Sequence, residues 1–348
     1  MLYCEPSLAR EEDPVAEIVL VEAMSHSPFL YTDPHLWNDI RSKRPTSESN
    51  PWLTEDENIE MYERCQMAFG VLKKKLEDAK PDVILVFGDD QIEQFDFSNF
   101  PGFAIFVGDE YEGYRTFPRQ GMVPGARGDW TEKTPETWVK VKSQPDLAKE
   151  LAVNLVKREF DLSFMIDVPN QQHGVGHAFM RPMHYLVPDY HIPVLPFYVN
   201  CFYGPQPTAN RCYKLGRAVR EIIDDSPLDL RVAVIGSGGL WHTPGNPQAW
   251  LNEEFDAESL AHVRAGDAKG FADHFDAYGA EKPDNYGPDT IKWIDGATDM
   301  YNGIGSGTGE TRNWVVASAV VDGVPGTVVD YVPVYSSPCA MGFAYWEP

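Results

Sequence analysis

The chain has 348 residues, of which 29 are basic and 53 are acidic, so its formal net charge is −24. At about 150 residues per domain, this length fits one large domain or two ordinary ones. Apolar residues make up 43% and aromatic residues 12% of the chain, which excludes wholesale disorder. The negative charge argues against binding to a nucleic-acid backbone, and no apolar run approaches the 18 residues of a membrane span.

The N-terminus and the cysteines indicate a reducing compartment. The first residues, MLYCEPSLAREEDP, are acidic and polar, whereas a secretory signal is basic and then apolar. The five cysteines are odd in number and form no CxxC pair, which argues against a disulfide framework and a thiolate zinc site. We therefore expect a soluble, cytoplasmic protein.

The first half of the chain has clear helix and strand signals. Ile18 to Val21 form a short apolar run, and Thr54 and Glu57 have the spacing of a capping box. Apolar residues at helical spacing follow, so the pattern predicts a helix over 56–79. Pro81 ends this helix, and the continuous apolar run over 83–87 predicts a fully buried strand.

Helices and strands then alternate. The further predicted elements are a helix over 146–158, a strand over 162–166, an apolar segment over 194–199, a helix over 208–223, a strand over 232–235, acidic helical sequence to about 300, and apolar segments over 314–321 and 327–334. This alternation predicts an α/β fold with a central mixed sheet flanked by helices.

Two long stretches, 31–55 and 108–140, are rich in Pro, Gly, aromatic and charged residues without periodicity. In a compact domain such segments tend to be pocket walls or lids, so we interpret them as long active-site loops. We therefore expect a single catalytic domain over 1–348, with residues 1–16 as an N-terminal extension.

Polar, chemistry-bearing residues follow several of the predicted strands. The segments 24–28, 88–93 and 236–242 come directly after apolar strands, and 172–177 also follows a strand. In α/β folds, ligands bind in the loops beyond the carboxyl ends of strands. We therefore expect the functional site to be built from these segments.

Four of the nine histidines lie in these segments: His26, His173, His177 and His242. Together with Glu253 and Glu254 they suggest a metal site of imidazole and carboxylate, a donor set that suits non-haem Fe(II) and also zinc or manganese. The alternative is that each histidine is a hydrogen-bonded structural residue. Residue patterns alone indicate a metalloenzyme and do not choose the metal.

The chain also resembles the catalytic subunits of class III extradiol ring-cleavage dioxygenases, such as the protocatechuate 4,5-, gallate and 3-O-methylgallate enzymes. The resemblance is collinear over about residues 17–345. Its landmarks are Ser25 to Pro28, Asp90-Gln91 with Phe95, Pro101 and Phe103, Gln144 to Ala148, His177 with Pro182, Pro196 to Asn200, Pro205 and Pro207, Arg211-Cys212, Leu215-Gly216, Gly236 to His242, and Asn252 with Glu254 to Asp256.

The resemblance implies a site in which two histidines and one glutamate hold Fe(II), leaving positions for a vicinal diol and O2. His26 matches the first ligand and Glu254 the carboxylate ligand. His177 matches the acid/base histidine, which would take a proton from a substrate hydroxyl and later return one. The implied partners are a small aromatic substrate and O2, and relatives of this type are often dimers, so a homo-oligomer is expected.

The chain departs from the family pattern at two positions. Gln91 stands where the family has its second histidine ligand, and Gln144 stands where a histidine lines the substrate pocket. Three outcomes are open: Gln91 ligates through its amide oxygen, a neighbouring carboxylate such as Glu93, Asp89 or Asp90 compensates, or the site has lost iron. His173 and His242 are further candidates for substrate binding, with loop-stabilising hydrogen bonds as the alternative.

Three functions therefore remain open from sequence. The first is a Fe(II) ring-cleaving dioxygenase acting on a catecholic or gallate-like phenolic acid. The second, motivated by Gln91, is a metal-dependent enzyme of the same fold with altered or non-oxidative chemistry on an aromatic substrate. The third is a non-catalytic dioxygenase subunit, against which the retention of His26, His177 and Glu254 counts.

Overall fold

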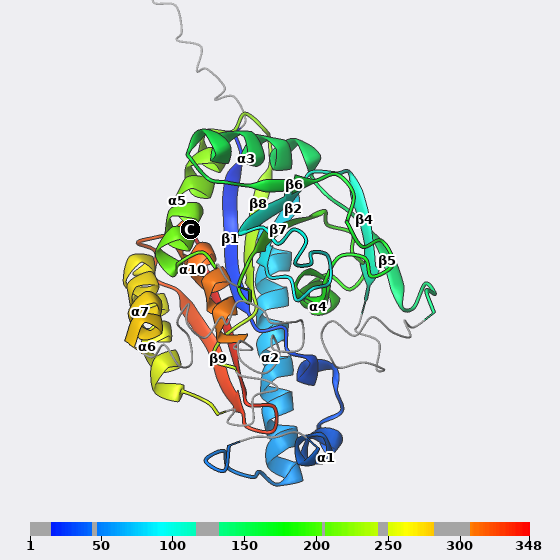
Figure 1. Cartoon of the computed structure of the whole chain (residues 1–348), viewed down its shortest axis with the longest axis vertical. Coiled ribbons are helices and arrows are strands. Elements are labelled where there is room, and N and C mark those ends of the chain that lie inside the picture. The colour runs from blue at the N-terminus through cyan, green and yellow to red at the C-terminus, as the bar shows by residue number, and fades with distance from the viewer. Residues whose placement is uncertain (1–14, 44–46, 116–131, 204–205, 243–249, 282–306) are drawn as a thin grey trace, which may run out of the picture.

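The computed structural model describes residues 15–43, 47–115, 132–203, 206–242, 250–281 and 307–348. An eight-stranded mixed sheet crosses its centre in the order β6-β3-β7-β2-β8-β1-β10-β9 (Figure 1). These strands are β1 (Glu17–Met24), β2 (Val83–Gly88), β3 (Phe103–Phe106), β6 (Ser163–Met165), β7 (Val194–Val199), β8 (Arg231–Ser237), β9 (Thr327–Val334) and β10 (Cys339–Trp346). The strands β4 (Glu110–Tyr114) and β5 (Trp138–Lys142) form a separate antiparallel pair.

The four central strands β7, β2, β8 and β1 are parallel. The flanking strands β3 and β10 run antiparallel to β7 and β1, so the predicted mixed α/β sheet is confirmed. Parallel strands end at the same edge of a sheet, so the segments after Met24, Gly88 and Ser237 meet there. Three of the four segments in which the site is expected therefore lie at one edge of the sheet.

Helices cover both faces of the sheet. On one face lie α2 (Glu55–Ala79) and α4 (His177–Leu186), and on the other lie α3 (Pro145–Lys157), α5 (Ala209–Asp224), α6 (Glu253–Ala265), α7 (Ala268–Glu281) and α10 (Thr311–Val320). The strand β2 serves both layers, because Leu85 and Phe87 pack with α5 and α10 whereas Ile84 and Val86 pack with α2 and α4. This double burial explains why its sequence is continuously apolar.

Local signals set the helix boundaries well. The Thr54 side chain accepts from the Glu57 N–H and the Glu57 carboxylate accepts from the Thr54 N–H, so the predicted capping box is present. At the other end, Lys80 adopts the left-handed conformation that terminates α2. The predicted helices over 146–158 and 208–223 also match α3 and α5 within one residue at each end.

The two stretches predicted to be irregular contain regular structure, so that prediction needs correction. The first holds the short helices η2 (Pro34–Leu36) and α1 (Trp37–Ser42), with η1 (Pro28–Tyr31) before them. The second begins with β4 and ends with β5, which alternate exposed and buried residues weakly over only five residues each. Such short patterns are hard to distinguish from loops among turn-forming residues. Residues 116–131 of that stretch lie outside the described residues.

The C-terminal apolar segments have different structures. Residues 327–334 form β9, whereas 314–321 lie mostly in α10, every residue of which is buried. Of the stretch predicted to be helical up to about residue 300, residues 253–265 and 268–281 are helical, whereas 250–252 are not. Residues 243–249 and those beyond 281 in this stretch lie outside the described residues, as does most of the predicted N-terminal extension. Among the helices described, none is both long and apolar enough to cross a membrane.

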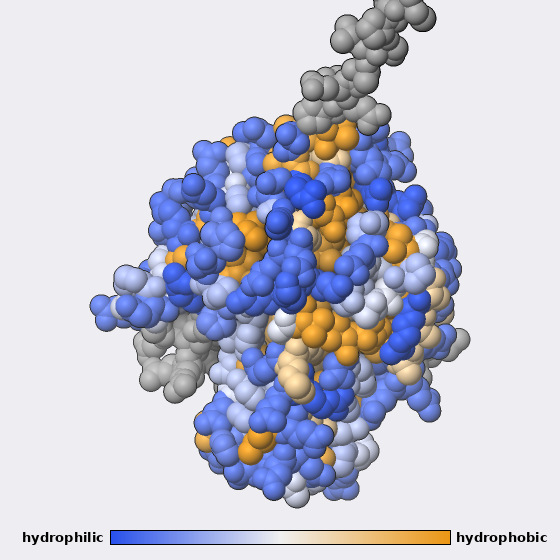
Figure 2. Space-filling model, turned by 180° about the vertical axis from the view of Figure 1, so that it is seen from behind, coloured by the Kyte–Doolittle hydropathy of each residue, from blue (hydrophilic) through white to orange (hydrophobic). Residues whose placement is uncertain are grey.

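Seen from behind, polar side chains cover most of the surface and apolar ones are exposed in separate patches (Figure 2). Large apolar side chains are exposed on α3 and at the β6 edge of the sheet, including Val153, Phe164 and Ile166. These three line a groove of about 610 Å³ together with Val107 and Lys149. The groove lies next to β3 and β6 and contains no residue of the strand-end loops described above.

A buried carboxylic acid within the sheet leads to a prediction about stability. Glu22 on β1 is fully buried between Ile235 and Tyr345, and neither of its carboxyl oxygens has a hydrogen-bond partner among the described residues. Burial raises the pKa of Glu22 well above its usual value, so the folded state holds a proton that the unfolded chain releases. The stability that this group contributes is therefore greatest at low pH and falls as the pH rises above about 4.5.

We expect Glu22→Met to raise the free energy of unfolding at pH 8 by about 1–3 kcal/mol, because it removes an unsatisfied polar group from the core. Urea unfolding at pH 5 and pH 8 measures this, and the gain should be smaller at pH 5. Glu22→Gln is the control for titration alone, since it keeps a polar group without an ionisable proton. Equal or lower stability of Glu22→Met at pH 8 would contradict the argument.

Candidate metal centre

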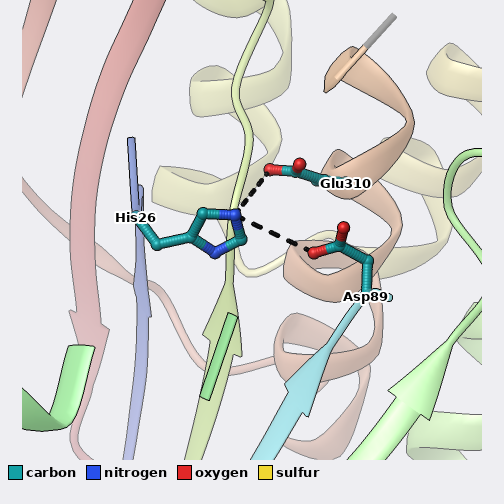
Figure 3. Close-up of side chains that lie close together, drawn as sticks. All are labelled: His26, Asp89 and Glu310. Carbon is teal, nitrogen blue, oxygen red and sulfur yellow. Dashed lines mark ion pairs between the residues drawn. The ribbon is translucent and has the colours of Figure 1, made fainter. Parts of the chain in front are cut away.

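Three buried side chains converge at the carboxyl edge of the sheet: His26, Asp89 and Glu310 (Figure 3). His26 follows β1, Asp89 follows β2, and Glu310 ends the short helix η4 (Gly307–Glu310) immediately before α10. One ligand atom from each residue lies within 4.8 Å of the others. The His26 Nε2 atom is 3.4 Å from Glu310 Oε2 and 3.9 Å from Asp89 Oδ1.

Hydrogen bonds fix the orientation of the His26 ring. Its Nδ1 atom is 2.9 Å from the Ser237 hydroxyl, which itself donates to the carbonyl of Ala178. The Ser237 oxygen therefore accepts the Nδ1 proton, so in the neutral ring Nε2 has the lone pair and faces the two carboxylates. Arg181 donates to the His26 carbonyl and holds the backbone. In histidines that ligate metals, one ring nitrogen typically donates a hydrogen bond to the protein and the other faces the metal site. His26 has this arrangement, with Nδ1 as the donor and Nε2 facing two carboxylates.

Glu310 is held in place by backbone groups of the loop that follows β8. The Gly239 N–H donates to Glu310 Oε2 at a distance of 2.9 Å. Gly238 lies against the same carboxylate with a φ of +112°, and a Cβ there would be 2.5 Å from Glu310 Oε2. Glycine at position 238 therefore allows both the backbone conformation and the approach of the carboxylate.

Two carboxylates and one imidazole are buried together in this cluster. Asp89 and Glu310 are both buried, and Asp89 Oδ1 has no hydrogen-bond partner among the described residues. Burial, and then the charge of Glu310, raise the pKa of Asp89 well above its usual value. Burial opposes the ionisation of Glu310, but His242 and His26 outweigh it and lower its pKa. Two buried carboxylates facing an imidazole lone pair fit a divalent cation.

Gln91 borders the cluster and is placed as a hydrogen-bond donor. Its amide nitrogen is 3.2 Å from Glu310 Oε1, 3.3 Å from Asp89 Oδ2 and 3.5 Å from His177 Nε2. All three neighbours are acceptors if His177 is protonated on Nδ1, so the amide N–H groups face them. The predicted role of Gln91 as a metal ligand through its amide oxygen is not favoured by this orientation.

His177 and Glu93 form a second pair beside Gln91. The His177 Nδ1 atom is 2.8 Å from Glu93 Oε1, and the His177 N–H donates to the same carboxylate. Burial lowers the pKa of His177 to about 4, so the ring is neutral at neutral pH. The alternative role of Glu93 as a compensating metal ligand is not favoured, because its carboxylate is directed at His177. On the loop after β2, the carboxylate that faces His26 is that of Asp89.

The other two predicted histidines occupy different positions. His242 lies on the far side of Glu310, with its Nε2 atom 3.4 Å from Glu310 Oε1 and its Nδ1 atom 2.9 Å from the Leu240 carbonyl. His173 lies behind Glu93, with its Nε2 atom 3.6 Å from Glu93 Oε1. These contacts support positioning of carboxylates by both rings, and the predicted binding of substrate by His173 and His242 stays a prediction.

The structure does not bring Glu254 to the cluster, and the carboxylate beside His26 belongs to Glu310. Glu254 is exposed in the first turn of α6. Its neighbours explain the sequence pattern: Asn252 caps the helix, and the buried Asp256 accepts from the Trp241 N–H and the Tyr331 hydroxyl. The residues around Glu254 thus serve helix capping and packing, and the position of Glu254 does not support its predicted role as a ligand.

Gln144 also lies away from the cluster. It precedes α3, and the adjacent Ser143 N–H donates to the carbonyl of Asp109, which follows β3. Because β3 runs antiparallel to β7, the end of β3 lies at the edge of the sheet opposite the metal cluster. The predicted role of Gln144 in substrate binding is therefore not supported by its position.

An α/β sheet with a histidine and two carboxylates at the carboxyl edge of its parallel strands defines a candidate metalloenzyme. Residues 24–343 match the family model described as the catalytic LigB subunit of aromatic ring-opening dioxygenase. The chain belongs to this family, and the resemblance drawn from the sequence is confirmed.

Several curated proteins are similar to parts of the chain. A gallate dioxygenase of Pseudomonas putida is 37% identical over 118 residues, which is 33% of this chain and 33% of that protein. The 2,3-dihydroxyphenylpropionate/2,3-dihydroxicinnamic acid 1,2-dioxygenases of Photorhabdus laumondii and Dechloromonas aromatica are 28% and 26% identical over 53% and 69% of this chain. The matches span 33%, 50% and 61% of these three relatives, so less than two thirds of each.

A solved structure, that of the uncharacterized protein JW3007 from Escherichia coli K12, covers 94% of this chain and is itself covered to 99%. It has 13% sequence identity to this chain and a TM-score of 0.47.

Proposed function

We propose that this chain is a Fe(II)-dependent extradiol-type dioxygenase that opens the ring of a catecholic or gallate-like phenolic acid with O2. The observation that carries the proposal is the His26 lone pair facing two buried carboxylates, with the neutral ring of His177 alongside. Membership of a family of ring-opening dioxygenases supports the reaction class. The relatives named after gallate and dihydroxyphenylpropionate support a dihydroxylated aromatic acid as substrate.

In this proposal His26, Asp89 and Glu310 hold the metal. When bound, Fe(II) would supply the Lewis-acid and redox chemistry that brings a diol and O2 together. In the neutral ring, the hydrogen bond from His26 Nδ1 to Ser237 leaves Nε2 with the lone pair for ligation. The hydrogen bond from Gly239 to Glu310 holds that carboxylate toward His26.

His177 moves the proton. Its Nδ1 proton is donated to Glu93, so Nε2 is the acceptor nitrogen, and this nitrogen lies 3.5 Å from the Gln91 amide at the border of the metal cluster. The ring edge of His177 packs against the His26 ring, with 4.7 Å between centroids. From this position His177 takes a proton from a substrate hydroxyl at Nε2 and returns it later in the reaction.

One observation favours a second candidate function. The metal cluster contains one imidazole and two carboxylates, and this oxygen-rich donor set also suits Mn²⁺ and other hard cations. A metal-dependent enzyme of the same fold with non-oxidative chemistry on an aromatic compound is therefore the alternative.

Oxygen uptake separates the two functions. Protein reconstituted anaerobically with Fe(II) is tested in an oxygen electrode with catechol, protocatechuate, gallate and methylated gallates, with metal-free protein as the control. We expect Fe(II)-dependent uptake with at least one diol, accompanied by loss of the aromatic absorbance. Absence of uptake with every diol, despite a bound metal, would contradict the dioxygenase and favour the alternative.

A further inference from the structure

The buried carboxylate of Glu93 is not one of the three residues of the metal cluster, but it contacts His177 beside that cluster. It lies on the loop after β2, four residues beyond Asp89, and is 5% exposed. Its oxygens accept from both the ring and the backbone N–H of His177. Glu93 therefore contacts His177 at two points. The contact with Nδ1 orients the ring, and the contact with the backbone N–H caps the start of α4.

The start of α4 is shaped to admit this carboxylate. The N-cap residue of α4 is Gly176, which has no side chain to cap the helix, and Glu93 supplies the acceptor in its place. A Cβ on Gly176 would lie 2.3 Å from Glu93 Oε2. The helix thus begins with a residue that leaves room for a carboxylate from another loop, and an anion at a helix N-terminus is electrostatically favourable.

The same carboxylate determines which ring nitrogen of His177 holds the proton. A carboxylate is an acceptor only, so the contact of 2.8 Å requires a proton on Nδ1. In a neutral imidazole the other nitrogen, Nε2, then has the lone pair. That nitrogen faces the amide group of Gln91, whose N–H can donate to it. Hydrogen bonds on both sides of the ring are consistent with one tautomer.

We propose that Glu93 is a positioning residue that fixes His177 in the Nδ1-protonated tautomer, with Nε2 directed at the metal cluster as a proton acceptor. Glu93 does this from behind the ring and does not ligate the metal. The kinetic consequence rests on the proposed function of His177 as acid/base, whereas the tautomer itself does not.

The tautomer can be read directly by two-bond ¹H–¹⁵N correlation NMR of metal-free, full-length protein labelled with ¹⁵N-histidine. The His177 signal is assigned by its loss in His177→Asn. We expect the Nδ1-protonated pattern in the wild type and its loss in Glu93→Ala, with Glu254→Gln on α6 as a matched surface control that retains it. An Nε2-protonated His177 in the wild type would overturn the proposal whatever the variants do.

Kinetics and metal binding complete the test. For Fe(II)-loaded Glu93→Ala we expect kcat to fall about 10–100-fold, while KM and the Kd for Fe(II) stay within about 2-fold. Glu93→Asp, which keeps an acceptor, should recover part of kcat. A parallel loss of Fe(II) affinity would show that Glu93 is a ligand and overturn the proposal. Wild-type protein that shows the expected tautomer but consumes no O2 would contradict the proposed function and leave the positioning role intact.

Discussion

Glu310→Gln is expected to weaken Fe(II) binding by at least 10–100-fold and to reduce oxygen uptake to the level of metal-free protein. Loss of a group that merely supports a metal ligand already costs about that much in affinity, and this change removes a charged oxygen donor. The substitution keeps the size of the side chain, and an amide oxygen can still accept from the Gly239 N–H. Fe(II) titration of the metal-free protein and oxygen uptake measure the two effects.

The matched control for this prediction is Glu254→Gln. Glu254 is exposed in the first turn of α6, so its substitution should leave Fe(II) affinity and oxygen uptake unchanged within about 2-fold. Thermal unfolding of both variants checks that they are folded. Metal binding that is lost in Glu254→Gln but retained in Glu310→Gln would contradict the assignment of Glu310, since the ligand would then be the residue that the structure places on the surface.

The second large effect is expected for His177→Asn, which should lower kcat about 10²–10⁴-fold with little change in Fe(II) affinity. This range is the usual contribution of a general acid or base. Asparagine keeps an N–H donor near the position of Nδ1, so the contact with Glu93 can be retained, but it has no group at the position of Nε2. Steady-state oxygen uptake at saturating diol, normalised to bound iron, measures the effect.

His173→Asn is the matched comparison, because His173 also approaches Glu93, with its Nε2 atom 3.6 Å from Glu93 Oε1. We expect its kcat to change only a few-fold. Similar losses in the two variants would mean that the observed effect comes from disturbing Glu93 and not from the Nε2 atom of His177.

Much of the fold could be predicted because its signals are local. The capping box before α2 and the continuous apolar run of β2 depend only on neighbouring residues, and the structure confirms both. By contrast, α10 is buried on every side, so its sequence has no amphipathic period to reveal a helix. The strands β4 and β5 are short and are far apart in the sequence, so their formation depends on tertiary contacts and not on local signals.

The candidate site was predicted in part. His26, Asp89 and Gln91 lie at the ends of strands, where topology makes a site predictable, and the structure brings them together. Glu310 was missed because it belongs to no strand end: it follows the glycine-rich segment 305–309, which by itself resembles an ordinary loop. A charged residue at the start of an otherwise buried helix is the signal that could have identified it.

The position of Glu254 away from the cluster has a physical explanation. Collinear landmarks around it mark residues needed for folding, since Phe255 is in the core and Asp256 is a buried hydrogen-bond acceptor. Resemblance over such a segment aligns the helix correctly but does not distinguish an exposed glutamate from a ligand. Placement of the carboxylate required the three-dimensional arrangement of β1, β2 and α10.

The most direct test of the central claim is anomalous diffraction from crystals of the full-length protein grown anaerobically with Fe(II). We expect one strong peak within coordination distance of His26 Nε2 and of carboxylate oxygens from Asp89 and Glu310, with Gln91 outside that distance. A peak coordinated by Glu254, or an ordered His26–Asp89–Glu310 cluster with no metal at saturating Fe(II), would contradict the assignment of this cluster as the metal centre.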